Sequence, residues 1–480
     1  METTIVKEVN VFVCSYDEFF CEKAEFPVGI DSYQRPYIWD ELKARELLQD
    51  LKEYLESGSS VPFYMGSILL HKDEQAGRMF IIDGQQRLTT LSILYYALNG
   101  KLVNVEKIAL EYDSPISIQN IQRIQHVFSG LQGWDQYTDL FGKIHFTFIT
   151  TASEDQAFTF FDTQNNRGVR LNPSDLLKAY HLRSVKGEEF QKDCANKWES
   201  IQGYDLWNEK DFIAQVLLPS LWRARTWRGQ NSLTFEDDGG LLYEFMKRTV
   251  QSDADNSVKL YPNSNNVFNA RLRLDSNKAY IFEMQAEENG DNKILPFIIR
   301  QPINNGMGFF LFIEKYADVM KYLFEDENAD SEVLAFRDFY SNVWEKTSVY
   351  LRELFVLAAV MYYDQFRSDR LLEFSLRLDH VLGAIRLDKN YIFKVAPLKF
   401  LKEMDLNLLD VISQAFRTNE VFEFLELLSR EITIYHTEKI VKGKGVQGRY
   451  KERLLNYYGR DSFEHKLNWI TSEFLKGRYK

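Results

Sequence analysis

The stretch RMFIIDGQQRLTTLSILYYAL, residues 78–98, constrains the fold of this chain more than any other. The apolar run at residues 79–82 is typical of a buried strand, Asp83 and Gly84 interrupt it, and leucines at helical spacing follow. We therefore expect residues 84–87 to lie where a strand passes into a helix. The first N–H groups of a helix have no partner within it, and the helix dipole makes that end attractive to anions.

The side chains at this junction suit a phosphate ligand. Gly84 leaves room for a close approach, Arg87 offers a planar fork of donors, and the hydroxyl of Thr90 follows one turn later. The alternative is that Asp83 and Gly84 form a tight turn and that Arg87 pairs with a surface carboxylate. Both interpretations stay open from these residues alone.

A second junction of the same kind lies at residues 164–175, QNNRGVRLNPSD. It places Asn165 and Arg167 just before a helix that Asn172 can cap, with Pro173 at its first position. The two junctions could hold the phosphates of a nucleotide from two sides, with Asp83 or Asp175 holding Mg²⁺ through water. The alternative is that these residues only end one helix and cap the next.

The rest of the chain suggests two domains, since 480 residues are many for one core. Strand and helix patterns alternate up to about residue 200, and long helical patterns without β alternation follow. The predicted fold class is α+β: a small mixed α/β domain at residues 1–200, then a larger, mostly α-helical domain at residues 201–480.

The last 43 residues, 438–480, form a basic tail: they hold eleven Lys or Arg and five Asp or Glu, whereas the whole chain has a formal charge of −12. Aromatic residues between the basic ones predict stacking surfaces for nucleic acid. The alternative is a solvated basic helix. The aromatic residues are Tyr450, Tyr457, Tyr458, Trp469 and Tyr479.

Other features exclude several classes of protein. The first residues carry acids where a secretory signal needs a basic region, and no stretch approaches the roughly twenty apolar residues of a membrane span. The three cysteines form neither a disulfide framework nor a CxxC zinc motif. The net charge argues against a protein coated with basic surface, but it allows a local basic groove. We expect a cytoplasmic protein without a membrane partner.

Three ordered blocks carry a family resemblance: QRPYIW at residues 34–39, IDGQQRLTTL at 82–91 and FDTQNNRGVRLNPSDLLKA at 161–179. Together they resemble domain-of-unknown-function family 262, the ParB-like N-terminal domain of GmrSD- and SspE-type restriction proteins. The resemblance covers about residues 10–200. It implies a ParB/sulfiredoxin-like fold, a DGQQR segment that binds and hydrolyses a nucleotide, and a QRPYxW segment that senses DNA, often modified DNA.

The resemblance also assigns roles to residues of this chain. The implied catalytic residues are Asp83, Gln86 and Arg87. The implied nucleotide-binding residues are Gly84, Gln85, Arg87, Thr90, Asn165 and Arg167. The implied DNA-sensing residues are Tyr33, Gln34, Arg35, Tyr37 and Trp39, although Tyr37 and Trp39 could equally belong to the core. Gln164 replaces the acid of the second ParB box and Arg167 comes one residue early, which leaves Asp83, Asp162 and Asp175 as the metal ligands to consider.

Family members often end in a nuclease module with an H-x-x-P signature, which this chain lacks: His380, His436 and His465 have no proline three residues later. The leading hypothesis is an NTP-dependent sensor or regulatory component of a bacterial DNA restriction or anti-phage defence system, with Mg²⁺ and a nuclease partner chain. The sequence does not distinguish GTP, ATP and CTP, and it leaves open hydrolysis and a homo-oligomer. The alternatives are a non-hydrolysing, nucleotide-switched DNA-binding module and a stand-alone metal-dependent nuclease.

Overall fold

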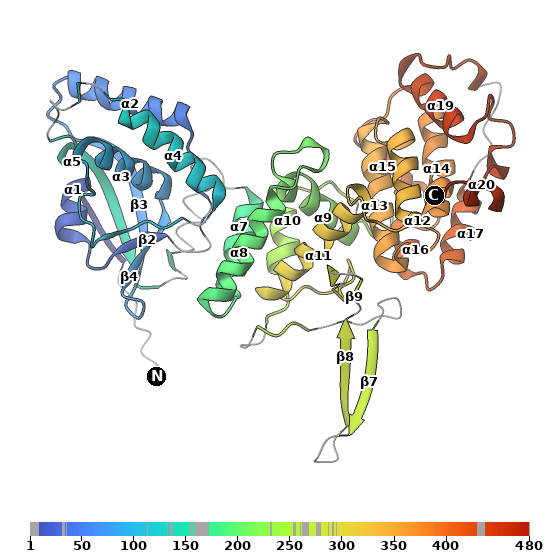
Figure 1. The fold of residues 1–480 in the computed structure, drawn as a ribbon, viewed down its shortest axis with the longest axis horizontal. Helices are drawn as coiled ribbons and strands as arrows, with labels where there is room; N and C mark the ends of the chain where they lie inside the picture. Colours follow the sequence, from blue (N-terminus) through green and yellow to red (C-terminus); the bar gives the residue numbers. More distant parts are fainter. Residues whose placement is uncertain are drawn as a thin grey trace. The chain divides into compact units, whose positions relative to one another are not determined.

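The chain forms two compact units, Met1–Arg183 with Gly187–Glu199 and Ser184–Lys186 with Ser200–Lys480. The first contains a mixed α/β sheet and the second is mostly helical (Figure 1), so the predicted α+β fold class is confirmed. The computed structural model describes residues 9–30, 34, 36–112, 114–131, 133–134, 137, 139–153, 156–157, 172–230, 233–252, 256–259, 261, 268–274, 280–286, 288–289, 292–293, 295–429 and 437–479.

The N-terminal unit is built on a six-stranded sheet with the strand order β1-β6-β3-β4-β2-β5. The β1–β6 and β3–β4 pairs are antiparallel, and the β3–β6, β2–β4 and β2–β5 pairs are parallel. The strands are β1 (Val9–Ser15), β2 (Val28–Ile30), β3 (Phe63–Asp73), β4 (Arg78–Asp83), β5 (Ile108–Ala109) and β6 (Ile144–Thr151). The helices are α1 (Tyr16–Glu18), the π-helical η1 (Phe19–Lys23), α2 (Glu41–Glu56), α3 (Gln85–Asn99), α4 (Pro115–Ser129), α5 (Leu140–Lys143), α7 (Pro173–Ser184) and α8 (Glu188–Gln202).

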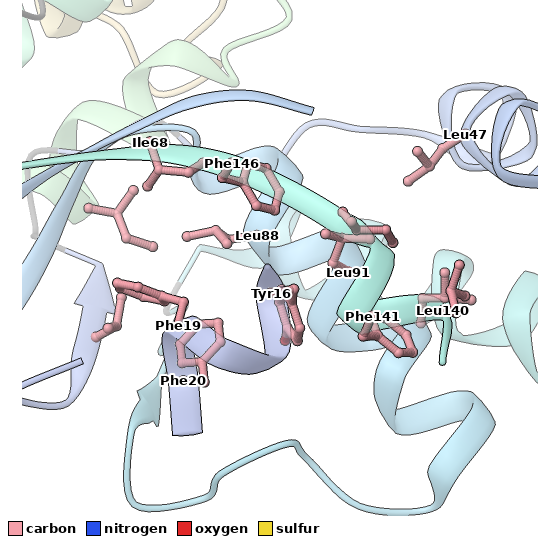
Figure 2. Close-up of a cluster of buried hydrophobic side chains, with 14 of the residues drawn as sticks. Tyr16, Phe19, Phe20, Leu47, Ile68, Leu88, Leu91, Leu140, Phe141 and Phe146 are labelled. Carbon is pink, nitrogen blue, oxygen red and sulfur yellow. The ribbon is translucent and has the colours of Figure 1, made fainter. Parts of the chain in front are cut away.

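Apolar side chains on one face of this sheet form the core with the helices packed on it. In β6, Phe146 and Phe148 are fully buried, as expected where apolar residues alternate along a strand. The ring of Phe148 stacks on Phe19, with ring centres 3.7 Å apart. Figure 2 shows Leu88 and Leu91 of α3 in the same cluster. The core therefore fixes α3, and with it the Asp83–Arg87 junction, against the sheet.

Of the described helices of the second unit, α13 (Val349–Phe366) and α14 (Leu371–Asp388) are the most deeply buried, since most residues of both are inaccessible. Helices buried on most sides belong to the interior of a domain. The other elements are η2 (Leu206–Asn208), η3 (Ile213–Leu217), α9 (Leu218–Thr226), α10 (Asp238–Leu242), η4 (Tyr243–Lys247), β7 (Phe268–Leu274), β8 (Tyr280–Ala286), β9 (Glu288–Asn289), β10 (Asn292–Lys293), α11 (Met307–Phe324), α12 (Ser331–Phe339), η5 (Tyr340–Trp344), α15 (Ala396–Glu403), α16 (Leu408–Gln414), α17 (Thr418–Leu428), α19 (Gly445–Tyr458), η6 (Lys466–Asn468) and α20 (Ser472–Lys476).

The sequence shows no clear β alternation after residue 200, but the described part of the structure contains four short strands there. Strands β7 and β8 form an antiparallel hairpin, in which Phe268 lies opposite Ala286 and Leu274 lies opposite Tyr280, and β9 pairs with β10. Seven-residue strands give few periods of alternation, and here the patterns of long helices surround them.

The C-terminal tail is fastened to α14 through a buried carboxylate. Asp379 accepts hydrogen bonds from Lys466 Nζ at 2.8 Å, from Trp344 Nε1 at 3.1 Å and from the Tyr450 hydroxyl. The neighbouring His380 is 4 % exposed, and its pKa lies well below the usual value because of burial and of the charges of Lys466 and Arg377. The C-terminal segment is thus part of the helical core.

Four of the five aromatic residues of the tail do not form the predicted stacking surface, and the fifth, Tyr479, is half-buried. Tyr450, Tyr457, Tyr458 and Trp469 are all less than 9 % exposed, and their rings pack on other aromatic rings of the helical unit. Apolar ring area is more stable inside a core than in water, and the helix α19 supplies that core. These four rings are therefore not available to stack on nucleic-acid bases beside the positive charges of the tail.

Candidate functional site

The junction between β4 and α3 has the geometry that the sequence predicts. Gly84 ends the strand with a left-handed conformation, φ 96° and ψ 7°, and no side chain caps the first turn of α3. A Cβ at position 84 would lie 2.2 Å from Ile68 Cδ1, so the position requires glycine both for its backbone angles and for space. The positive end of the dipole of a fifteen-residue helix therefore lies at Gly84, which favours an anion there.

Arg87 binds the backbone of its own sheet. Its Nη1 donates to the carbonyl of Met65 at 2.7 Å and its Nη2 to the carbonyl of Ser67 at 2.8 Å. The register of β3 against β6 shifts between Tyr64 and Ser67, so Met65 lies inside a strand irregularity and Ser67 borders it. A Cβ at Gly66 would lie 2.4 Å from the Arg87 guanidinium, so a second glycine makes room for the side chain.

Arg87 also faces a carboxylate, because Asp83 Oδ2 lies 3.6 Å from its Nη2. Burial lowers the pKa of Arg87 and the charge of Asp83 raises it, and arginine stays charged at neutral pH. The alternative stated above, pairing with a carboxylate, is therefore realised. Arginine carries five N–H donors, and the two carbonyls use only two of them. With side chains 24 % and 37 % exposed, Arg87 and Asp83 are both reachable from solvent.

The side chain of Gln86 holds the QRPYIW block. Its Oε1 accepts from the N–H groups of Ile38 at 2.9 Å and Trp39 at 3.2 Å, and its Nε2 donates to the Pro36 carbonyl at 3.1 Å. The side chain is buried, and these three bonds use both ends of the carboxamide. In this structure Gln86 positions residues 36–39.

Tyr37 and Thr90 belong to the core. Both are fully buried. Thr90 Oγ1 donates to the Gln86 carbonyl at 2.7 Å, so the Tyr37 hydroxyl is the donor in its 2.5 Å bond to Thr90. The backbone of Tyr37 is held by Ser117 Oγ at 2.8 Å and by Asn120 Nδ2 at 3.0 Å. Of the two interpretations of Tyr37, the structure shows the core one, and Thr90 offers its hydroxyl to no external ligand.

The other predicted site residues in and near the first two blocks differ in their burial and contacts. Gln34 is half-buried and donates through Nε2 to the Ile82 carbonyl at 3.1 Å. Trp39 is half-buried and packs against the core, and Gln85 is buried. Tyr33 and Arg35 lie outside the described residues. The structure thus joins the first two sequence blocks: Gln34 reaches β4, and Gln86 binds the segment that follows Arg35.

The second junction is described only at its end. Asn165, Arg167 and Asp162 lie outside the described residues. Asp175 is half-buried in the first turn of α7, where its N–H donates to the Asn172 carbonyl at 2.9 Å. Within the described ranges, no three His, Cys, Asp or Glu side chains gather closely enough to hold a metal ion. Nor does any described helix have the length and apolarity to cross a membrane.

Sequence reasoning missed the groups that support this junction: Gly66, the carbonyls of Met65 and Ser67, and the pair Ser117 and Asn120 behind Tyr37. Nothing in the order of residues shows a contact across 80 positions. One signal was available, since a glycine within the apolar strand at residues 63–70 is typical of a bulge or of a close approach.

Two family models match the chain. The model described as "GmrSD restriction endonuclease, N-terminal domain" matches residues 16–182, inside the region that carries the resemblance stated above. The model described as "Family of unknown function (DUF7834)" matches residues 190–441, which is more than half of the chain. No curated protein matches. The match to residues 16–182 supports the GmrSD part of the resemblance, and the assignment to family 262 stays a prediction.

Proposed function

This chain belongs to the family of unknown function DUF7834, and because its residues 16–182 also match the N-terminal domain of a restriction endonuclease, we propose that it is a component of a DNA restriction or anti-phage defence system. In this role it binds a nucleoside triphosphate with Mg²⁺, contacts DNA, and leaves DNA cleavage to a nuclease partner chain. The match to residues 16–182 carries the proposal.

The β4–α3 junction is the proposed nucleotide site. The positive end of the α3 dipole attracts phosphate oxygens to the first turn of the helix, and the donors of Arg87 that do not bind carbonyls add a positive charge. Asp83, the more exposed partner of the pair, holds Mg²⁺ directly or through water. Asn165 and Arg167 close the site from the second junction, as the resemblance implies.

The hydrogen bonds of Gln86 offer a route from nucleotide to DNA. The residue lies in the first turn of α3, where the phosphates bind, and its side chain holds the backbone of residues 36–39. A ligand that shifts this turn therefore shifts the segment next to Gln34 and Arg35. Gln34 and Arg35 of that block contact DNA, as the resemblance implies, and the buried Tyr37 anchors the segment.

Titration calorimetry of the full chain with ATP, GTP and CTP tests the proposed site. We expect one of these nucleotides to bind in Mg²⁺, and Asp83→Asn to weaken that binding several-fold while leaving binding in EDTA unchanged or tighter, because it removes a negative charge. Asp83 is a better target than Arg87, whose side chain supports the sheet.

Asp50→Asn, an exposed carboxylate in α2, is the matched control and should bind like the wild type. If no nucleotide binds to the wild type, or if Asp83→Asn binds in Mg²⁺ as tightly as the wild type, the site is wrongly placed.

A further inference from the structure

The segment at residues 439–449, KIVKGKGVQGR, which we call the basic loop, concentrates positive charge on the second unit. It contains four basic residues and no acidic one. The side chains of Lys439, Lys442, Lys444 and Arg449 are all exposed. Other basic residues of the tail are used inside the protein: Lys466 is buried against Asp379, and Arg453 donates to main-chain carbonyls.

The acids next to the basic loop are Glu438, which precedes it, and Glu452, whose carboxylate lies beside Gly443. Among the residues that the structure describes, Lys442, Lys444 and Arg449 form no ion pair within 4.0 Å. Burial and then the charge of Lys442 lower the pKa of Lys451, while the charge of Glu438 raises it. A chain with a formal charge of −12 thus carries a local positive surface, which attracts a polyanion.

The backbone of the loop is fixed before any ligand arrives. Gly443 N–H donates to the Gly448 carbonyl at 3.1 Å, and Gly448 N–H donates to the Lys444 carbonyl at 3.2 Å. A Cβ at Gly448 would lie 2.1 Å from the Val441 carbonyl oxygen, so these two hydrogen bonds require glycine at position 448. Lys451 of α19 also supports the loop, since its Nζ donates to the Ile440 carbonyl at 3.2 Å. Cations on a fixed backbone lose less conformational entropy when they bind.

We propose that the basic loop binds the phosphate backbone of nucleic acid, through Lys442, Lys444 and Arg449. The choice of DNA as the polyanion rests on the proposed function. A membrane surface is disfavoured because the exposed apolar residues of the loop are two valines, whereas interfacial segments insert Trp, Phe or Leu. Since Tyr450, Tyr457, Tyr458 and Trp469 are buried, the contact reads phosphates without stacking of these four rings on bases, and it is independent of DNA sequence.

The salt dependence of DNA binding tests this inference on the full chain. Fluorescence anisotropy with labelled duplexes of two unrelated sequences gives the slope of log K against log salt, to which each phosphate contact contributes about 0.9. The triple variant Lys442→Gln/Lys444→Gln/Arg449→Gln should reduce the magnitude of the slope by about 2 to 3, equally for both sequences. The control Lys389→Gln/Lys399→Gln/Lys402→Gln removes three exposed lysines of the same unit and should leave the slope unchanged.

All six positions are exposed, so thermal unfolding should be the same in both triple variants and the wild type. An unchanged slope in the basic-loop variant, an equal loss in the control, or binding to phosphatidylserine vesicles in place of DNA overturns the inference. Nucleotide titration of the same preparations reports on the proposed function separately, because it does not involve the basic loop.

Discussion

Replacing Arg87 by methionine should loosen the sheet of the N-terminal unit. The side chain spans the carbonyls of Met65 and Ser67, with bonds of 2.7 and 2.8 Å. A hydrogen bond to a charged group contributes about 1.5–3 kcal/mol, and solvent screening together with the relief of a partly buried charge offsets some of the sum. The free energy of local opening of the sheet should therefore fall by about 2–4 kcal/mol, which raises the equilibrium constant for opening roughly 30- to 1,000-fold.

Hydrogen exchange with mass spectrometry measures this loss in the full chain, because peptides from β3 and β4 report on the N-terminal unit alone. Protection of residues 63–70 and 78–83 should fall in Arg87→Met, and helices of the second unit should keep theirs. Arg87→Lys retains the charge but places its donors on one atom, so the protection of these peptides should be intermediate between that of Arg87→Met and that of the wild type. Wild-type protection in Arg87→Met would refute the structural role of this side chain.

Three further substitutions have defined outcomes. Gly84→Ala should lower the free energy of unfolding, measured by urea denaturation, by more than the roughly 1–2 kcal/mol that a left-handed backbone costs, because its Cβ also meets Ile68. Tyr37→Phe should lower the free energy of unfolding, measured by thermal unfolding, by only about 1 kcal/mol, because the Thr90 hydroxyl keeps its hydrogen bond to the Gln86 carbonyl. His380 has a folded-state pKa below its unfolded value of about 6.5. As pH falls, His380 is therefore protonated in the unfolded state before it is protonated in the folded state, which favours unfolding. Stability should then fall by up to about 1.4 kcal/mol per pH unit below about pH 6.5. Urea unfolding of His380→Gln should lack this part of the slope, and an identical slope would contradict it.

Periodicity predicted the elements around the site because they are set by local physics. An apolar run, a glycine and leucines at helical spacing specify β4, the turn at Gly84 and α3 without reference to distant residues. The start of α2 is set by local physics as well, because the carboxylate of Asp40 caps it by accepting from the Lys43 N–H at 2.9 Å.

Residue type predicted the side-chain roles less well, because contacts across the chain decide them. Arg87 and Gln86 carry donors that suit phosphate, but the nearest acceptors in this structure are carbonyls of β3 and of residues 36–39. Tyr37 follows a loop-like segment, yet it is fully buried through partners 53 and 80 positions away. A buried backbone group must find a hydrogen-bond partner, and only the folded chain shows which side chain supplies it.

Phosphate release from the nucleotide, measured with and without DNA on the full chain, tests the proposed function most directly. An NTP-dependent restriction component should release phosphate only in the presence of Mg²⁺, faster when DNA is added, and Asp83→Asn should abolish most of that release while Asp50→Asn retains it. No release from ATP, GTP or CTP with or without DNA, or full release by Asp83→Asn, would contradict the proposal.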